Sequence, residues 1–196
     1  MGYLFAASIF DLVHFGLITV VVQWVLLWLG LRYMAAFEPL FGKAKPWLIA
    51  YMVLCLLPAV NYTGPDIQDI PRFLLYSVSL IGLVRTLLWL YFWCLIYRAI
   101  TALEPIYGDL HSRMLWKLFY IDLGLYAASY TITLLLMVFT PVSPPTFVTA
   151  LVVLISVAQL IVAIIRLVYL YRAWQDFNTR AEQLRGFSQD TFSEDK

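Results

Sequence analysis

Two charged side chains inside strongly apolar stretches are the residues of this chain best suited to chemistry. Arg85 lies near the middle of stretch 73–97, and Asp122 lies within stretch 114–139. Ionisable groups inside a membrane are costly, and they usually pair with one another or handle ions, protons or ligands. We therefore interpret them first as a structural ion pair and second as an ion-, proton- or anion-handling site.

The depths of the two charges support a pair. Arg85 is 13 residues from Arg98, and Asp122 is 9 residues from Arg113, where Arg98 and Arg113 mark the basic ends of the two stretches. At about 1.5 Å per helical residue the depths differ by roughly 6 Å, which an arginine side chain spans. The sequence predicts an ion pair between Arg85 and Asp122.

A second polar pair lies near the N-terminus. Asp11 and His14 are three residues apart, which puts them on one helix face. One carboxylate and one imidazole are too few ligands for a metal site. We expect a shallow, outward polar notch that water reaches, with a proton relay as the alternative.

The remaining inventory disfavours an enzyme. No Gly-x-Ser-x-Gly or His-Glu-x-x-His motif occurs. Cys55 and Cys94 lack the spacing of a disulfide or zinc motif. His14 and His111 fall at opposite ends of the spans, which excludes a shared haem. We expect no catalytic residue, metal or cofactor, and the net charge of +1 argues against nucleic acid as a partner.

The elements that carry these residues are predicted to cross a membrane. The chain is 63% hydrophobic and 13% charged, whereas soluble domains carry about 25% charged residues. A spanning helix needs about 20 apolar residues. We predict an all-α integral membrane protein with five transmembrane helices, at residues 4–31, 46–63, 73–97, 114–139 and 147–171. Pro58 makes the second the weakest.

An internal repeat relates the first four predicted helices. Residues 32–42 match residues 98–108 at five of eleven positions, with a constant shift of 66 residues. The shift covers two spans, and after two spans the chain again runs in its first direction. The repeat therefore predicts two parallel helical hairpins, at about 4–63 and 73–139. The identical pairs are Arg32 and Arg98, Ala36 and Ala102, Glu38 and Glu104, Pro39 and Pro105, and Gly42 and Gly108.

The repeated residues predict a turn and two ion pairs. Proline interrupts a helix and glycine suits the left-handed residue after one, so both copies are expected to turn at their Pro and Gly. Arg32 and Glu38 are six residues apart, about 240° around a helix, and do not face each other. We therefore expect a swap, in which Arg32 pairs with Glu104 and Arg98 with Glu38.

The repeat also bears on the intramembrane charges. The first-copy residues equivalent to Arg85 and Asp122 are Thr19 and Leu56. Both charges are thus absent from one copy and present in the other. Charges that occur together are expected to neutralise each other.

Lys and Arg gather at one end of the predicted spans, in 32–45, in 98–117 and after 165, while the other end holds only Arg72. By the positive-inside rule the N-terminus is expected outside and the C-terminus in the cytoplasm. All seven Trp residues fall in the cytoplasmic half. They are interpreted as a headgroup belt, or alternatively as a surface for a partner helix or lipid. A bacterial inner membrane is the expected compartment.

The C-terminal region is expected to lie outside the membrane. Residues 1–171 form the single transmembrane domain. Trp174, Phe177, Ala181 and Leu184 recur at three- and four-residue steps, which predicts an amphipathic cytoplasmic helix over 172–187. Residues 188–196 are polar and are expected to be mobile.

These features favour a non-catalytic structural or accessory subunit of a multi-component membrane protein complex. The expected partners are the lipid bilayer and either other membrane subunits or further copies of this chain. The alternative is a small homo-oligomeric transporter or channel that uses Arg85 and Asp122. The low polar content of the spans counts against a water-filled path.

Overall fold

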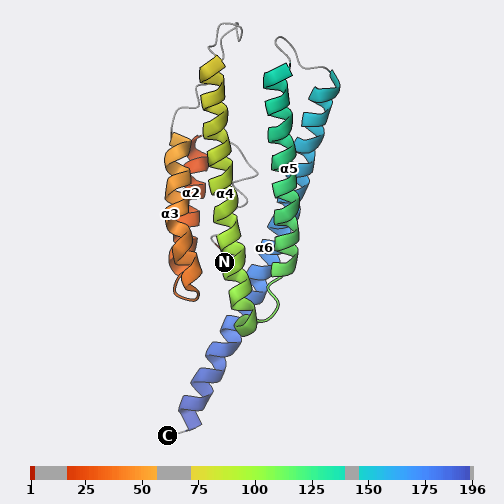
Figure 1. The fold of residues 1–196 in the computed structure, drawn as a ribbon. Coiled ribbons are helices and arrows are strands. Elements are labelled where there is room, and N and C mark those ends of the chain that lie inside the picture. The colour runs from red at the N-terminus through yellow and green to blue at the C-terminus, as the bar shows by residue number, and fades with distance from the viewer. Residues whose placement is uncertain (3–16, 57–71, 140–145, 195–196) are drawn as a thin grey trace.

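The computed structural model of the chain describes residues 1–2, 17–56, 72–139 and 146–194 (Figure 1). Their regular structure consists of five long helices, and no strand occurs in these ranges, which confirms the all-α prediction. The helices are α2 (Leu17–Met34), α3 (Pro39–Leu56), α4 (Arg72–Tyr107), α5 (Ser112–Phe139) and α6 (Thr146–Glu194).

Within the described residues, three helices are long and apolar enough to cross a membrane. Their apolar segments are Ser79–Tyr107, Ser112–Leu135 and Thr146–Leu184. Helices α2 and α3 have 18 residues each and measure about 27 Å at the usual helical rise. The predicted spans 4–31 and 46–63 lie partly outside the described residues.

The helices alternate in direction (Figure 1). Helix α3 packs most extensively on α4, and α5 packs most extensively on α6. Helix α4 meets α5 and α6 near the turn at 108–111, and the ribbons of α4 and α5 diverge away from it (Figure 1). The bundle is therefore tightest at the end that carries the two short turns.

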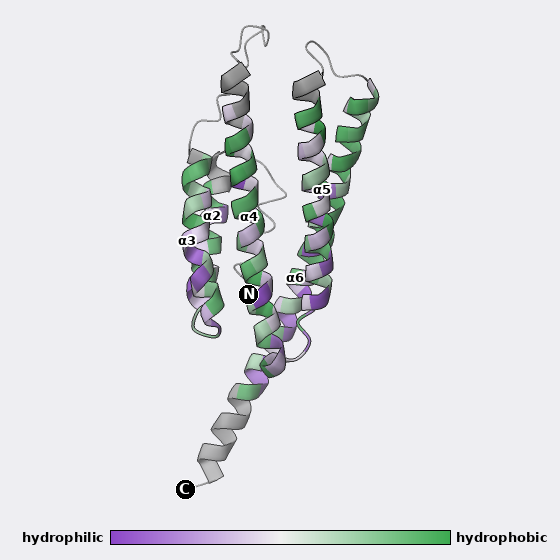
Figure 2. Ribbon diagram, in the orientation of Figure 1, coloured by the Kyte–Doolittle hydropathy of each residue, from purple (hydrophilic) through white to green (hydrophobic). Residues whose placement is uncertain are grey.

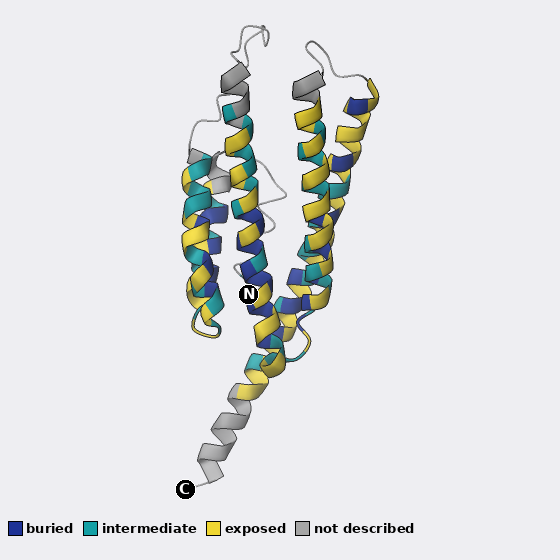
Figure 3. Ribbon diagram, in the orientation of Figure 1, coloured by how far each residue is buried: buried dark blue, intermediate teal, exposed yellow. Residues whose placement is uncertain are grey.

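The buried core lies toward that same end. Its fully buried large side chains come from α2, α3 and α4, and include Leu27, Leu31, Phe41, Phe92, Trp93, Ile96 and Tyr97. Trp24, Trp89 and Trp93 belong to the buried residues rather than to a headgroup belt. Most of α5 and α6 above this region is apolar and exposed (Figures 2 and 3), as expected for helices that face lipid.

The two copies of the repeated segment fold differently. Helix α2 ends at Met34 and α3 begins at Pro39, where the missing amide proton costs no helical hydrogen bond. Helix α4 instead continues through Pro105 to Tyr107. A proline this close to a helix end removes only one of the last backbone bonds.

The two repeated glycines also differ. Gly108 has a φ of 78° and forms the left-handed turn that the sequence predicts. Gly42 lies inside α3, so the prediction of a turn at this residue is wrong. Because α3 already starts at Pro39, the chain has turned before it reaches Gly42.

Helix α6 is longer than the sequence suggested. It runs for 49 residues from Thr146 to Glu194, about 74 Å at the usual rise. The expected separate helix at 172–187 and most of the expected polar tail at 188–196 are continuations of it. One glycine in a helix, here Gly186, costs about 1 kcal/mol, which so long a helix tolerates.

Met1 lies at the same end as the turns. Its amine donates a hydrogen bond to Met34 Sδ over 2.9 Å, and burial lowers the pKa of this amine to about 5. The adjacent Gly2 packs against the Trp174 indole of α6. Met1, Gly2 and the extension of α6 thus lie at one end of the bundle, whereas the sequence predicts the two termini on opposite sides of the membrane.

Candidate functional site

Asp122 is the centre of the candidate site, but it pairs with Arg166 rather than with Arg85. Arg166 Nη1 of α6 donates to Asp122 Oδ2 of α5 over 2.8 Å. The Arg166 and Asp122 side chains are only 12% and 7% exposed. Arg85 is exposed on α4, so the predicted Arg85–Asp122 pair is wrong. The physical reason is helix packing, since α5 packs more extensively on α6 than on α4.

A tryptophan from a third helix covers the pair. The Arg166 guanidinium carbon lies 5.4 Å from the centre of the Trp93 ring of α4, a distance typical of a cation–π contact. Trp93 is itself 2% exposed. The three side chains therefore join α4, α5 and α6 at one point.

The geometry suits structural neutralisation. Two opposite charges in hydrogen-bonding contact cancel most of each other's field, and removal of either one leaves an uncompensated buried charge. A short, buried carboxylate–guanidinium contact also restricts sliding of α5 past α6. The arrangement can hold these helices in register.

Arg85 has different surroundings. The adjacent Thr86 Oγ1 lies 2.8 Å from the Tyr130 hydroxyl of α5, and a Cβ added at Gly82 would lie 3.6 Å from the same hydroxyl. A small polar contact thus joins α4 and α5 beside Arg85. Among the described residues, no carboxylate forms an ion pair with Arg85.

The two repeated glutamates bind backbone amides instead of arginines. Glu38 Oε1 accepts from the Leu40 amide over 3.1 Å at the start of α3. Glu104 Oε1 accepts from the amides of Leu110 (3.3 Å) and Ser112 (2.9 Å), and its Oε2 accepts from Ser112 Oγ (2.7 Å).

The predicted swap of Arg32 with Glu104 and Arg98 with Glu38 is therefore wrong. Both arginines are exposed, and no ion pair joins them to these glutamates in the described part of the chain. The first amides of a helix have no intrahelical acceptor, and they attract a nearby carboxylate. The unpaired amides at the start of α3 and of α5 therefore explain why Glu38 and Glu104 bind backbone amides and not the two arginines.

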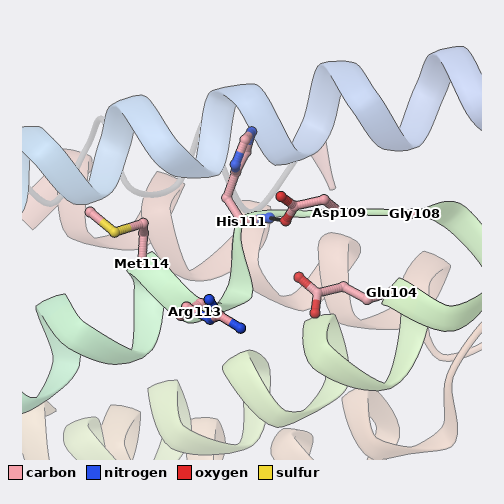
Figure 4. A pocket seen from close by; sticks show the side chains of 6 residues that line it. All are labelled: Glu104, Gly108, Asp109, His111, Arg113 and Met114. Atoms are coloured by element: carbon pink, nitrogen blue, oxygen red, sulfur yellow. Dashed lines mark hydrogen bonds between the residues drawn. The ribbon is translucent and has the colours of Figure 1, made fainter.

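A pocket of about 450 Å³ opens at the second turn (Figure 4). Its acidic groups are already engaged, because Glu104 holds the start of α5 and Asp109 Oδ1 accepts from the His111 amide over 2.8 Å. No cluster of three metal-ligating residues occurs among the described residues. The lining residues are Glu104, Gly108, Asp109, His111, Arg113 and Met114.

Helix α6 packs against both short turns, at residues 35–38 and 108–111. His111 Nε2 lies 3.2 Å from Asp176 Oδ2. The Phe177 ring, which is buried, lies 5.4 Å from the Phe37 ring of the first turn and 4.6 Å from the Tyr107 ring of the second. Part of the predicted amphipathic face thus packs on this chain itself.

Sequence reasoning missed Arg166, Trp93 and the His111–Asp176 contact. Arg166 lies inside the predicted span 147–171, although the charge pattern groups it with the basic C-terminal end. Its position among apolar residues was the available signal for a second partner of Asp122. Asp11 and His14, the predicted outer notch, lie outside the described residues.

Comparison with protein-family models, with curated proteins and with solved structures finds no match to this chain. The function of this chain is therefore proposed from the chemistry of the residues described above.

Proposed function

We propose that this chain is a non-catalytic accessory subunit of a multi-component membrane protein complex. The observation that carries the proposal is the exposure of Arg85 on α4. Arg85 lies within the apolar segment Ser79–Tyr107. Its exposed neighbours Ile81, Val84 and Leu87 are all apolar.

The depth of Arg85 makes its charge costly. It is 13 residues from Arg98, about 20 Å along the helix, which exceeds half of a hydrocarbon core of about 30 Å. A central arginine costs about 2.5–3.5 kcal/mol on insertion scales unless another group satisfies it. A carboxylate on a helix of another subunit would supply that group.

Two other charges inside the described apolar segments, Asp122 and Arg166, do not need a partner subunit. Asp122 and Arg166 neutralise each other inside the chain, and this leaves Arg85 as the arginine on the exposed apolar surface of α4. The channel alternative loses support from the same contact, because Asp122 is held by Arg166 instead of facing a path with Arg85.

The proposal includes a topology. The basic end, with both short turns and the extension of α6, is assigned to the cytoplasm by the positive-inside rule. Helices α2 and α3 are proposed to complete a set of five membrane-embedded helices. The five identities between residues 32–42 and 98–108 support a duplicated hairpin whose turns have since diverged. A bacterial inner membrane is the proposed compartment.

The test is purification of the tagged chain from its native membranes in mild detergent. Wild type and Arg32→Gln, which removes an exposed arginine of α2, should co-purify with other membrane chains at fixed stoichiometry. Arg85→Gln should lose them, whereas Arg85→Lys should retain part of the association. A homogeneous homo-oligomer that conducts ions in liposomes, with conduction dependent on Arg85, would overturn the proposal and establish the channel alternative.

A further inference from the structure

A fixed pair of aromatic rings lies where α4 and α5 meet at the basic end of the bundle. Trp116 Nε1 donates to Thr101 Oγ1 over 3.2 Å, and that hydroxyl donates to the Tyr97 carbonyl over 2.8 Å. The Tyr120 ring lies 5.9 Å from the Trp116 ring at an angle of 31°. Trp116 is half-buried, whereas Tyr120 is 63% exposed.

Three exposed cations flank these rings. Arg98 precedes Thr101 by three residues, and Arg113 precedes Trp116 by three and Lys117 by four. Residues three and four apart share a helix face, so Arg98 shares a face with Thr101, and Arg113 lies on the side of α5 that carries Trp116 and Lys117.

Within the described part of the chain, no carboxylate forms an ion pair with any of these three cations. Glu104 lines the pocket beside Arg113, but its two oxygens are occupied by Ser112 and the Leu110 amide. The face therefore carries three positive charges that no carboxylate of the described residues neutralises.

We propose that this face, defined by Arg98, Arg113, Trp116, Lys117 and Tyr120, binds the headgroup of an anionic phospholipid. Guanidinium groups match phosphate oxygens in a bidentate geometry. Lysine adds a third positive charge. Trp and Tyr rings are suited to the level of the headgroups, and basic pockets between transmembrane helices bind anionic lipids.

The other hairpin supplies a natural comparison. A shift of 66 residues takes Arg98 to Arg32, but it takes Arg113 and Lys117 to Trp47 and Tyr51. Trp47 and Tyr51 pack against the rings of Tyr91 and Trp89, at 4.6 and 4.7 Å. At these three equivalent positions the first hairpin therefore has one cation and the second has three. The basic residues of the first hairpin, Arg32, Lys43 and Lys45, serve as a control.

The test is native mass spectrometry of the full chain in detergent, titrated with phosphatidylglycerol and with phosphatidylcholine. The wild type should retain phosphatidylglycerol preferentially. Removal of each cation should weaken its binding about fivefold, from the attraction that one Lys or Arg contributes near an anionic surface. The triple variant Arg98→Gln/Arg113→Gln/Lys117→Gln should lose the preference, while Arg32→Gln/Lys43→Gln/Lys45→Gln should keep it.

Two further arms separate the causes. Inorganic phosphate at millimolar concentration should not displace the lipid, because the proposed ligand is a headgroup held with its acyl chains; complete displacement would identify a free-phosphate site and overturn the proposal. Trp116→Phe should weaken retention by less than the loss of Arg98. Equal lipid preference in wild type and triple variant, or equal loss in the control variant, would also overturn it. If the triple variant does not fold, each single Gln variant decides the same question.

Discussion

Arg166 of α6 donates to Asp122 of α5 across 2.8 Å, and this contact brings together residues 44 positions apart in the sequence. The pair lies against Trp93 of α4. An ion pair and a cation–π contact thus link the three longest of the described helices at this point. The consequences of the ion pair for stability can be measured directly.

Removal of one partner should be more harmful than removal of both. Asp122→Leu leaves Arg166 buried and uncompensated, and Arg166→Met does the same to Asp122, so each single variant should lose about 3–5 kcal/mol. The double variant Asp122→Leu/Arg166→Met should recover most of that loss. Thermal unfolding in detergent, followed by size-exclusion chromatography, measures the three shifts. A double variant as unstable as the worse single variant would refute the pairing.

Arg85→Gln is the matched control for that series. Arg85 was the partner that the sequence predicted, but it is exposed on α4. Its substitution should leave the unfolding temperature of the isolated chain close to that of wild type. A change in unfolding temperature as large as that of Arg166→Met would instead support an Arg85–Asp122 pair.

The contrast between Arg85 and Arg166 shows which features of the fold can be predicted from the sequence. Apolar length and composition predicted the helical class and α4, α5 and α6, because each of these follows from local properties of the chain. Depth along a helix is also local, and it made Arg85 a reasonable partner for Asp122. Which helix lies beside α5 is a tertiary property, and it selected Arg166.

The repeat shows a second limit. Its matched residues predicted similar turns, and the left-handed residue at Gly108 is confirmed. The first copy turns earlier, so Pro39 begins a helix while Pro105 lies inside one. Identical residues tolerate both states, since proline is accepted at a first helical position as well as near a helix end. The two turns have equal length, since residues 35–38 and 108–111 separate the helices, and they differ in where they lie relative to the matched residues.

Glu104 should matter more than Glu38. Among the described residues, Glu104 accepts hydrogen bonds from three donors across the second turn, whereas one amide donates to Glu38 in the first. Loss of a helix-capping side chain costs about 0.5–2 kcal/mol, and we expect Glu104→Ala near the upper end and Glu38→Ala near the lower. Parallel unfolding measurements test the order. Equal losses, or a larger loss for Glu38→Ala, would contradict the assignment.

The repeated glycines should respond in opposite directions to alanine. Gly108 has a φ of 78°, and an added Cβ would lie 3.2 Å from the Arg180 guanidinium carbon. Gly108→Ala should therefore cost about 1–2 kcal/mol from the left-handed conformation, with some added crowding. Gly42 is helical, and an added Cβ would lie 3.8 Å from the Ala35 Cβ, an ordinary contact. Gly42→Ala should be neutral or stabilise by up to about 1 kcal/mol. A destabilised Gly42→Ala would contradict the helical assignment.

Phe177 should decide whether the extension of α6 stays attached to the turns. Its buried ring contacts the rings of both Phe37 and Tyr107. Phe177→Ala therefore removes the apolar contact of α6 with both turns and should cost about 3 kcal/mol locally. Hydrogen exchange of the segment after residue 171 should then increase, while α4 and α5 stay protected. Leu184→Ala, at an exposed position of the same helix, is the control and should change nothing. Unchanged exchange in Phe177→Ala would mean that the His111–Asp176 contact and the Trp174 packing are enough to hold this part of α6, and the Phe177 contact would lose its assigned role.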